Sequence, residues 1–390
     1  MKKILFTIIL ITSNVSIPQS IRERNAVLVP QGYGIELLNS MGCSSIINNV
    51  SNISSMNPAS IYKLENLSLG FSYQFQTSLD TAWIAGIGTS RVQNYVPQSF
   101  GGIFHYENFS FGIGFSQQYN GSLDFDPIPI TTTTEPDGTG EYYYPEFENT
   151  IQSYTLSAAY QFEDAFADNN NFSVGLIYLL NNFHSRESIG MVTASAFALG
   201  SNFELGVHYD IKINDEEHLS FGTSFTTSTS ISDEIEYEGF STIIPGSILG
   251  DSSNYQIIPL SYSLLLSVPS ELSFDIYFNP ILNLEFLGRM NYIFWEDIAA
   301  NVKDQIEISS SAIYSFNPNT KASLGLHYTS KEYTEDYFNI SDELYALYFI
   351  GGFSFQLNFL KVDLAVADSH LFSGNFWEQT IGKIGFGIHL

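Results

Sequence analysis

Apolar and polar side chains alternate with a period of two residues along much of this chain, and this pattern restricts the folds that it can adopt. One segment shows it clearly, with polar or small residues between the apolar side chains of Leu67, Leu69, Phe71, Tyr73 and Phe75. The same period returns in 109–115, 156–162 and 219–225. Because successive side chains of a β-strand point to opposite faces, this period predicts strands that have one apolar face and one polar face.

The composition fits strands that form the wall of a barrel in a membrane. Charged residues make up 14% of the chain and aromatic residues 15%, whereas roughly 25% of an ordinary soluble domain is charged. The polar positions of the alternating segments are mostly Ser, Gly, Asn, Gln and Thr. A barrel with a lipid-facing outside and a polar lumen has this balance. We therefore predict an all-β fold, a transmembrane antiparallel β-barrel, whose lumen is polar but not strongly ionic.

The strand count follows from the number of alternating segments that are long enough to cross a bilayer, about ten residues each. Fifteen segments qualify: 67–76, 80–90, 98–106, 109–119, 151–162, 171–182, 197–211, 217–229, 271–279, 282–295, 306–316, 320–330, 345–357, 359–369 and 379–390. Single-chain bacterial barrels have an even number of strands. Either 67–76 does not span, or a strand near 255–268 is missing. We predict about 14 strands, with 16 as the alternative.

The connections between these strands alternate in length. The tight ones contain Glu107-Asn108, Asn279-Pro280, Asn317-Pro318-Asn319 and Asn358. The long ones cover 120–150, 183–196, 230–270, 331–344 and 370–378. Short turns at one end and long loops at the other are typical of outer-membrane barrels. The final segment also alternates up to the C-terminal Leu390, as expected of a strand that closes the barrel against the first one.

The charge of the chain excludes some partners and leaves others open. The formal net charge is −27, so the chain repels nucleic acid and has no basic patch for anionic lipid. The loops 120–150 and 230–270 are acidic and contain no Lys or Arg. They either keep one side of the protein soluble or bind divalent cations, and we expect them to face water outside the cell. The single cysteine, Cys43, excludes an intrachain disulfide.

The first 20 residues have the outline of a secretory signal peptide. Lys2 and Lys3 precede the short apolar run 4–11, and a polar stretch with small residues follows. The apolar run is too short to cross a bilayer as a helix, and no later stretch has the roughly eighteen consecutive apolar residues that a helical span needs. We expect residues 1–20 to be removed on export.

Residues 21–60 do not alternate. Small residues separate single apolar ones, which indicates short helical turns packed inside something rather than a surface helix with a broad apolar stripe. Asn57-Pro58 is a helix breaker that would end this segment just before the first strand. We therefore predict three parts: a signal peptide at 1–20, an N-terminal lumenal hatch at 21–64, and an outer-membrane barrel at 65–390.

Two patches of the sequence resemble the FadL/TodX-type outer-membrane transporters of hydrophobic compounds. The first is Ser40-Met41-Gly42-Cys43 followed by Asn57-Pro58-Ala59-Ser60, similar to a Gly-Met-Gly-Gly-like cluster and Asn-Pro-Ala-Gly in that family. The second runs from Val268-Pro269-Ser270 through Phe278-Asn279-Pro280 to Asn291-Tyr292-Ile293-Phe294-Trp295. Cys43 and Ser60 depart from the family pattern, in which Gly is usual at both positions.

This resemblance implies a fourteen-stranded barrel plugged by a hatch, passive uptake of hydrophobic small molecules, and an exit sideways into the membrane through a gap in the wall. The expected substrates are long-chain fatty acids or aromatic hydrocarbons. The hatch or gating residues implied are Gly42, Asn57, Pro58 and Ala59; the substrate-binding residues remain unknown. Expected partners are outer-membrane lipid, the substrate, and envelope or secreted proteins. The alternative is a PorV-like barrel that acts in protein secretion or surface attachment. In either case we expect the protein in the outer membrane of a Gram-negative-type bacterium.

The sequence favours a channel over an enzyme. It has no Gly-x-Ser-x-Gly elbow, no zinc-binding His-Glu-x-x-His and no phosphate-binding glycine loop. The seven His are scattered, with no pair at metal-ligand spacing, so we predict no catalytic residues, no metal and no cofactor. Gly112 and Gly114 lie two apart on one barrel face, which indicates close packing in a sheet. Trp83, Trp295 and Trp377 lie near predicted strand ends, where Trp commonly anchors a barrel at the membrane interface.

Overall fold

The computed structural model describes residues 50–81, 89–124, 128–129, 140, 142–143, 146–166, 169–189, 192–214, 217–234, 236–239, 263–297, 303–331, 344–371 and 378–389. The predicted signal peptide, Gly42, Cys43, Trp83 and Trp377 lie outside these ranges, as do most residues of the acidic loops.

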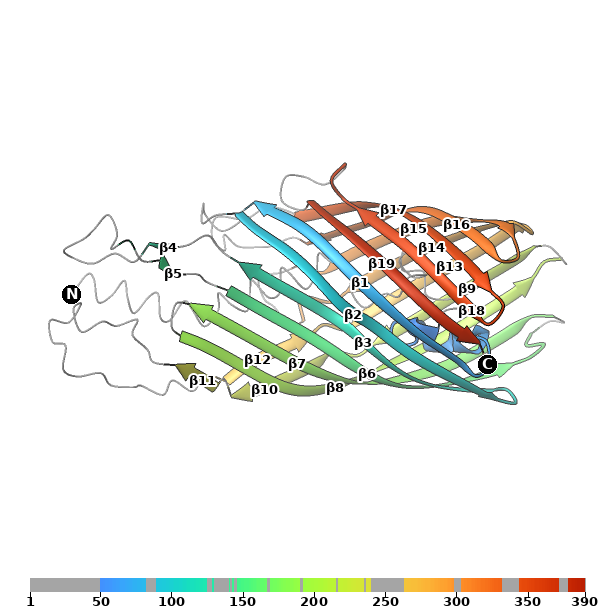
Figure 1. The fold of residues 1–390 in the computed structure, drawn as a ribbon. Helices are drawn as coiled ribbons and strands as arrows, with labels where there is room; N and C mark the ends of the chain where they lie inside the picture. Colours follow the sequence, from blue (N-terminus) through green and yellow to red (C-terminus); the bar gives the residue numbers. More distant parts are fainter. Residues whose placement is uncertain are drawn as a thin grey trace.

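Fourteen strands form a closed antiparallel barrel (Figure 1). They are β1 (Ser68–Thr81), β2 (Thr89–Tyr106), β3 (Phe109–Asp124), β6 (Glu146–Phe162), β7 (Asn171–Ile189), β8 (Val192–Lys212), β9 (His218–Thr226), β13 (Glu271–Ile281), β14 (Leu284–Ile293), β15 (Gln305–Asn317), β16 (Thr320–Lys331), β17 (Leu344–Leu357), β18 (Leu360–Asp368) and β19 (Glu378–His389). Neighbours in the sequence pair with each other, and β1 pairs with β19 to close the ring. The predicted role of the last strand is therefore confirmed.

Five short strands lie outside this ring. They are β4 (Ile128–Pro129), β5 (Tyr142–Tyr143), β10 (Thr229–Glu234), β11 (Glu236–Gly239) and β12 (Ser263–Val268). β10 and β12 pair with each other and continue the direction of β9 and β13 beyond a break in both strands. β11 pairs with the beginning of β8. The barrel wall therefore extends at this point into part of the predicted loop 230–270.

The predicted count of 14 strands is confirmed, but both explanations offered for the odd count are wrong. The surplus strand is 80–90, because β1 reaches Thr81 and β2 begins at Thr89. Segment 67–76 does belong to the wall, and the strand near 255–268 is β12, which is not part of the ring. In the structure Pro97 lies next to a β-bulge within β2.

Most tight turns are confirmed, with two corrections. Glu107 and Asn358 both adopt positive φ, 52° and 50°, in two-residue turns. The turn predicted at Asn279-Pro280 lies instead at Leu282-Asn283, since β13 continues through an irregularity to Ile281. The long loop predicted over 183–196 is also wrong, because β7 and β8 pair as far as Ile189 and Val192. The predicted strand segments 171–182 and 197–211 therefore stopped short of the ends of the two strands.

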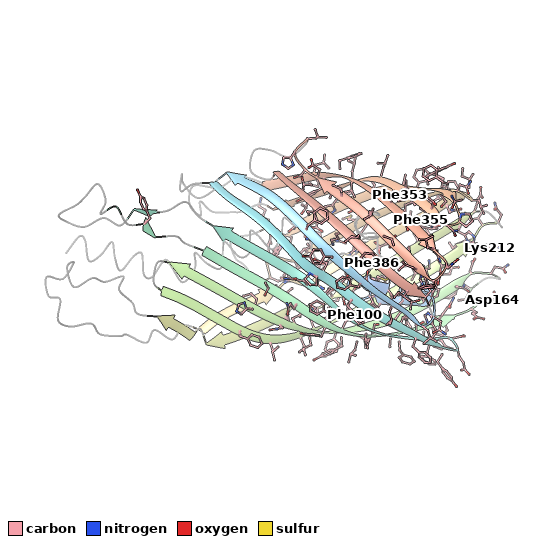
Figure 2. The ribbon with its side chains drawn as sticks, viewed as in Figure 1. Phe100, Asp164, Lys212, Phe353, Phe355 and Phe386 are labelled. Atoms are coloured by element: carbon pink, nitrogen blue, oxygen red, sulfur yellow. The ribbon has the colours of Figure 1, made fainter. Side chains whose placement is uncertain are left out.

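The outward positions of the wall are apolar. Figure 2 shows Phe100, Phe353, Phe355 and Phe386 on the outside of the barrel, and all four are exposed. Asp164 and Lys212 lie at the end that holds the tight turns. An exposed surface with this many Phe, Leu and Ile side chains is stable only against lipid. The apolar face read from the sequence is therefore the lipid-facing surface.

The inward positions are polar and more strongly charged than predicted. Arg289 on β14 donates to Ser273 at 2.9 Å and lies 3.4 Å from Glu271 and 3.8 Å from Asp275. Its neighbour Asn291 donates to Glu307 at 3.3 Å. The prediction of a lumen without strong ionic character is wrong, because a closed barrel can group a few charged side chains that lie far apart in the sequence. Buried charges of this kind require such pairing.

Candidate functional site: the hatch contact and the wall gap

Two short 3-10 helices precede the first strand and lie against the inner wall. They are η1 (Val50–Asn52) and η2 (Pro58–Lys63). Figure 1 shows these blue turns inside the ring of strands, near the end of the barrel where the chain ends. We call residues 50–64 the hatch segment. Its apolar side chains Val50, Ile53, Met56, Ile61 and Leu64 form a buried cluster with wall residues Ile103 and Ala159. Short helical turns are present in residues 50–64, as expected, whereas the rest of the predicted hatch, 21–49, lies outside the described residues.

The hatch segment fits the wall because the wall has no side chains beneath it. Six inward glycines lie under it: Gly70 on β1, Gly101 on β2, Gly112 and Gly114 on β3, Gly175 on β7, and Gly206 on β8. A Cβ on Gly70 would lie 2.6 Å from the backbone nitrogen of Ser51, and a Cβ on Gly175 would collide with the backbone of Pro58. We call these residues the glycine seat. Close packing at Gly112 and Gly114 is therefore confirmed, with the hatch segment as the packing partner.

Asn57 connects the hatch segment to two strands. Its Oδ1 accepts a bond of 2.9 Å from the backbone N–H of Ala59, which fixes the start of η2. Its Nδ2 donates to the carbonyl oxygens of Val207 on β8 and Thr223 on β9, each at 3.2 Å. Val207 and Thr223 face each other across the β8–β9 ladder. One side-chain amide therefore caps a helical turn and binds a strand pair at the same time.

The end of η2 is held by charge. Lys63 Nζ lies 2.7 Å from Asp210 Oδ1 on β8 and 3.3 Å from His208 Nε2. The Tyr62 hydroxyl donates to Asp210, and Ser220 donates to the same carboxylate at 2.5 Å. A carboxylate with these partners is well satisfied, so the contact fixes the hatch segment at its C-terminal end.

Burial changes the acid–base properties of the two hatch side chains. Desolvation lowers the pKa of Lys63 below its ordinary value, and the charge of Asp210 acts in the opposite direction. Desolvation raises the pKa of Tyr62, with the Asp210 charge adding to the shift. Tyr62 therefore stays neutral and acts as a hydrogen-bond donor, while Lys63 needs Asp210 beside it to keep its charge.

The described wall has a gap between β2 and β3. The two strands pair only from Ser99–Ser116 to Tyr106–Phe109. Beyond that point β2 continues along β1, and β3 continues along β6. Figure 1 shows the two ribbons together at their turn and farther apart toward the opposite end. The backbone ladder is therefore interrupted on this side of the barrel, in the half that lies away from the tight turn.

Two bulges explain where the β2–β3 ladder ends. Gln98 is an extra residue on β2 opposite β1, and Gln118 is an extra residue on β3 opposite β6. A bulge bends its strand and increases the local twist. Pro97 lies beside the first bulge and cannot donate a ladder hydrogen bond. Gln98 Nε2 instead donates to the carbonyl of Gln117 at 2.7 Å, so one buried side chain spans the edge of the gap.

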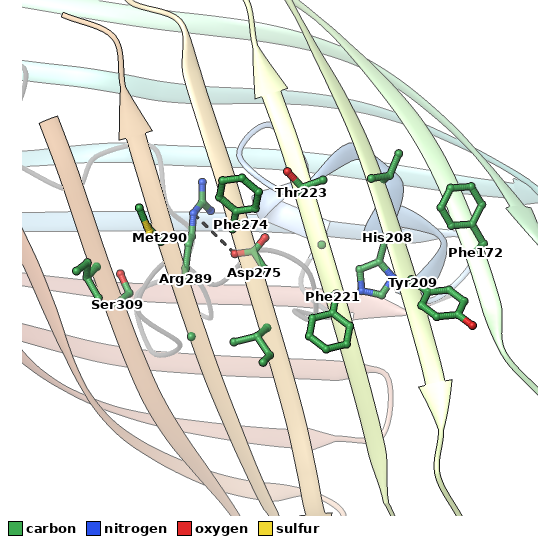
Figure 3. A pocket seen from close by; sticks show the side chains of 15 residues that line it. Phe172, His208, Tyr209, Phe221, Thr223, Phe274, Asp275, Arg289, Met290 and Ser309 are labelled. Atoms are coloured by element: carbon green, nitrogen blue, oxygen red, sulfur yellow. Dashed lines mark ion pairs between the residues drawn. The ribbon is translucent and has the colours of Figure 1, made fainter. Parts of the chain in front are cut away.

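A groove of about 580 Å³ lies elsewhere, on the outside of β7–β9 and β13–β15 (Figure 3). The side chains that enclose it from outside are apolar, aromatic or small, and include Phe172, Phe221, Phe274 and Met290. The Asp275–Arg289 ion pair belongs to the opposite, inner face of the same strands. The groove therefore forms part of the lipid-facing surface and is not the candidate route through the barrel.

The structure brings some of the hatch or gating residues predicted from the sequence together at the wall. Asn57, Pro58 and Ala59 all contact the wall, and Ala59 accepts a bond of 2.7 Å from Ser173. Gly42 lies outside the residues that the structure describes. Sequence reasoning missed Gly206, Asp210, Gln98 and Gln118. Only Gln98 carried a usable signal, because it directly follows Pro97, which cannot donate a ladder hydrogen bond.

Trp295 overturns one sequence interpretation. Its side chain is 6% exposed, and its indole N–H donates to Gln305 Oε1 at 3.0 Å on the inner side of the wall. The prediction that Trp295 anchors the barrel at the membrane interface is therefore wrong. A tryptophan near a strand end can point to either face of the wall, and its position in the sequence alone does not determine which face.

Within the ranges that the structure describes, no group of three or more His, Cys, Asp or Glu side chains is arranged to hold a metal ion. No helix within these ranges is both long and apolar enough to cross a membrane.

Comparison with solved structures identifies the fold. The toluene transporter TbuX of Ralstonia pickettii is 12% identical with a TM-score of 0.65, covering 93% of this chain and 99% of that chain. A FadL homologue of Pseudomonas aeruginosa is 12% identical with a TM-score of 0.62 over the same shares. The monoaromatic hydrocarbon channel CymD is 15% identical with a TM-score of 0.59, again over 93% and 99%. No protein-family model and no curated protein matches the sequence. Over nearly its whole length, this chain therefore has the fold of FadL-type hydrocarbon channels.

Proposed function

We propose that this protein is a FadL-type outer-membrane channel for the passive uptake of hydrophobic small molecules, of the fatty-acid or aromatic-hydrocarbon class. One observation carries the proposal: the hatch segment packs against Gly101 of β2 and Gly114 of β3, beside the interrupted β2–β3 ladder. A plug and a side opening together suit a substrate that leaves through the wall rather than through the end of the lumen. The channel fold of the solved structures supports the same function.

The proposed route begins at the long loops, passes along the lumen to the hatch, and leaves through the gap into the membrane. Apolar molecules would move without an energy source, because transfer of apolar surface from water to lipid releases roughly 25 cal/mol per Å². The apolar outer face of the barrel supports placement in the outer membrane, with lipid around the wall. The solved structures compared are channels rather than enzymes, which favours transport over catalysis.

Gating is assigned to the hatch, 21–64, and within it to Gly42, Asn57, Pro58 and Ala59. The contacts of Asn57 with β8 and β9 and of Pro58 with Gly175 support this role for the described part of the hatch. A shift of this turn would release both strands at once. The alternative function, a PorV-like barrel that serves protein secretion or surface attachment, receives no support from the structures compared.

The test is uptake by Gram-negative cells that lack a channel of this kind. Cells that express the wild-type barrel should accumulate radiolabelled toluene or oleate faster than cells with an empty vector. The double variant N57A/P58A should alter this uptake at least severalfold. The matched control N283A/P318A changes the same residue types in exposed turns and should behave like wild type. Equal accumulation in the wild-type, N57A/P58A and empty-vector cells would rule the proposal out.

A further inference from the structure

Several buried polar side chains lie along the inner side of β3, between Gly112 and the edge of the gap. Ser54 of the hatch segment has its Oγ 2.6 Å from the place where a Cβ on Gly114 would lie, and Gly114 pairs with Thr155 on β6. Ser157 pairs with Gly112 in the same ladder, with its Oγ 2.5 Å from the corresponding Cβ position. The hatch segment and β6 therefore bring three hydroxyl groups to one short stretch of β3.

Two side-chain amides extend this group. Gln98 precedes Ser99, the last β2 residue paired with β3, and its amide lies against the carbonyl of Gln117. Asn52 lies in η1, two residues before Ser54. We call Asn52, Ser54, Gln98, Thr155 and Ser157 the polar cluster. Their relative exposures lie between 0% and 6%, so bulk water does not reach them freely.

Each member of the polar cluster has one polar atom without a hydrogen-bond partner among the described parts of the chain. These atoms are Asn52 Nδ2, Ser54 Oγ, Gln98 Oε1, Thr155 Oγ1 and Ser157 Oγ. Buried polar groups are nearly always paired, and each one left unpaired destabilises the fold. Five such groups beside one wall gap indicate a place where a second molecule supplies the missing partners.

The chemistry of the polar cluster defines that molecule. The set contains an amide donor, an amide acceptor and three hydroxyls that can do both, and none of the five side chains carries a charge. A hydroxyl group, as in an alcohol or a phenol, donates one hydrogen bond and accepts up to two, so it supplies both kinds of partner to at most three of the five atoms. An alkane leaves every atom unpaired. A carboxylate accepts but does not donate, so it leaves Gln98 Oε1 without a partner.

We propose that the polar cluster is a subsite for the hydroxyl group of an amphipathic substrate, a long-chain alcohol or a phenol, at the point where its apolar part enters the β2–β3 gap. This inference rests on the proposed channel function and narrows its substrate class. A site built to hydrogen-bond a substrate hydroxyl discriminates against the analogue that lacks it, because its own polar groups then stay unpaired.

The experiment compares dodecanol with dodecane, which differ only in the hydroxyl. Binding of each radiolabelled ligand is measured to full-length mature protein in lipid nanodiscs and corrected for partitioning into empty nanodiscs. Wild type should bind dodecanol about tenfold more tightly than dodecane. The variants S54A and T155V remove unpartnered hydroxyls at nearly constant shape. They should reduce this preference to about threefold or less.

The matched control is S323A. Ser323 on β16 also has a buried hydroxyl without a partner in the described structure, but β16 is six strands away from β3 in the barrel order. Its loss should leave the tenfold preference intact. Heat-modifiable migration on gels verifies that each variant forms the barrel.

The outcomes separate the subsite from the channel function. Equal affinity for the two ligands in wild type overturns the subsite, and so does a preference that is the same in S54A and T155V, since the cluster then holds only water. In both cases, uptake of dodecane by whole cells leaves the channel function standing. If cells take up neither ligand and the purified protein binds neither, the channel function itself fails.

Discussion

Lys63 and Asp210 lie 147 positions apart in the sequence and form an ion pair of 2.7 Å inside the barrel. The pair ties the end of η2 to β8, and Tyr62 and Ser220 donate to the same carboxylate. Both side chains are largely shielded from water. Their contact is the strongest electrostatic link found between the hatch segment and the described wall.

This ion pair predicts a double-mutant cycle. D210N leaves the Lys63 charge without its counter-charge, and K63M leaves the Asp210 charge without its counter-charge. Each variant should therefore lower the free energy of unfolding by about 3 kcal/mol. The double variant K63M/D210N has no buried charge and should lose less than the sum of the two. Urea unfolding in detergent, followed by tryptophan fluorescence, measures all four proteins. Additive losses would show that the pair does not couple hatch to wall.

The glycine seat predicts that a single methyl group displaces the hatch segment. In G206A the new Cβ would overlap the side chains of Asn57 and Pro58. Overpacking of this kind costs about 1–3 kcal/mol, and detaching the turn is the cheapest way to relieve it. Ionic conductance through single channels in a planar bilayer should therefore rise severalfold.

The control for this prediction is G351A. Gly351 lies in β17, and a Cβ there meets only the side chain of Leu324, at 3.9 Å. This variant should conduct like wild type. If G206A also conducts like wild type while G351A folds normally, Gly206 is not a seat for the hatch segment.

The two bulges predict that the gap can be closed by restoring the ladder. Deleting Gln98 and Gln118 and replacing Pro97 with Val removes the extra residue from each strand and returns one backbone donor. The β2–β3 ladder should then extend past Ser99–Ser116, and uptake of hydrophobic probes should fall at least tenfold. Heat-modifiable migration should show a folded barrel with undiminished thermal stability. Undiminished uptake by a folded variant would mean that substrate leaves by another route.

The position of Trp295 predicts its fluorescence. In the variant W83F/W377F it is the single remaining tryptophan. Because its indole lies on the inner side of the wall, bonded to Gln305, brominated lipids should not quench its emission. A quenched signal would return Trp295 to the membrane interface and contradict the structure.

The alternation of side chains determined the class of fold and most of the strands, because a barrel wall must present one face to lipid and the other to the lumen at every strand. The turns at Glu107-Asn108 and Asn358 added the hairpin positions. Glu107 and Asn358 both occupy the left-handed region in these tight turns. The sequence also marked Asn57 and Pro58, because an Asn-Pro step ends one kind of structure and begins another. These are local signals, and each acts within a few residues.

Pairing across the barrel decided the rest. Nothing near Gly206 or Asp210 in the sequence shows that a turn some 150 residues earlier packs on them, because that contact depends on strand register around a closed ring. The gap arises from bulges on two strands that become neighbours only after pairing, and the polar cluster needs the hatch segment, β2 and β6 at once. Local sequence signals were therefore enough to predict the strands of the wall and the break at Asn57-Pro58, whereas the place where the hatch segment binds and the place where the wall is interrupted depend on contacts across the barrel. Contacts between distant residues depend on the register of every strand between them.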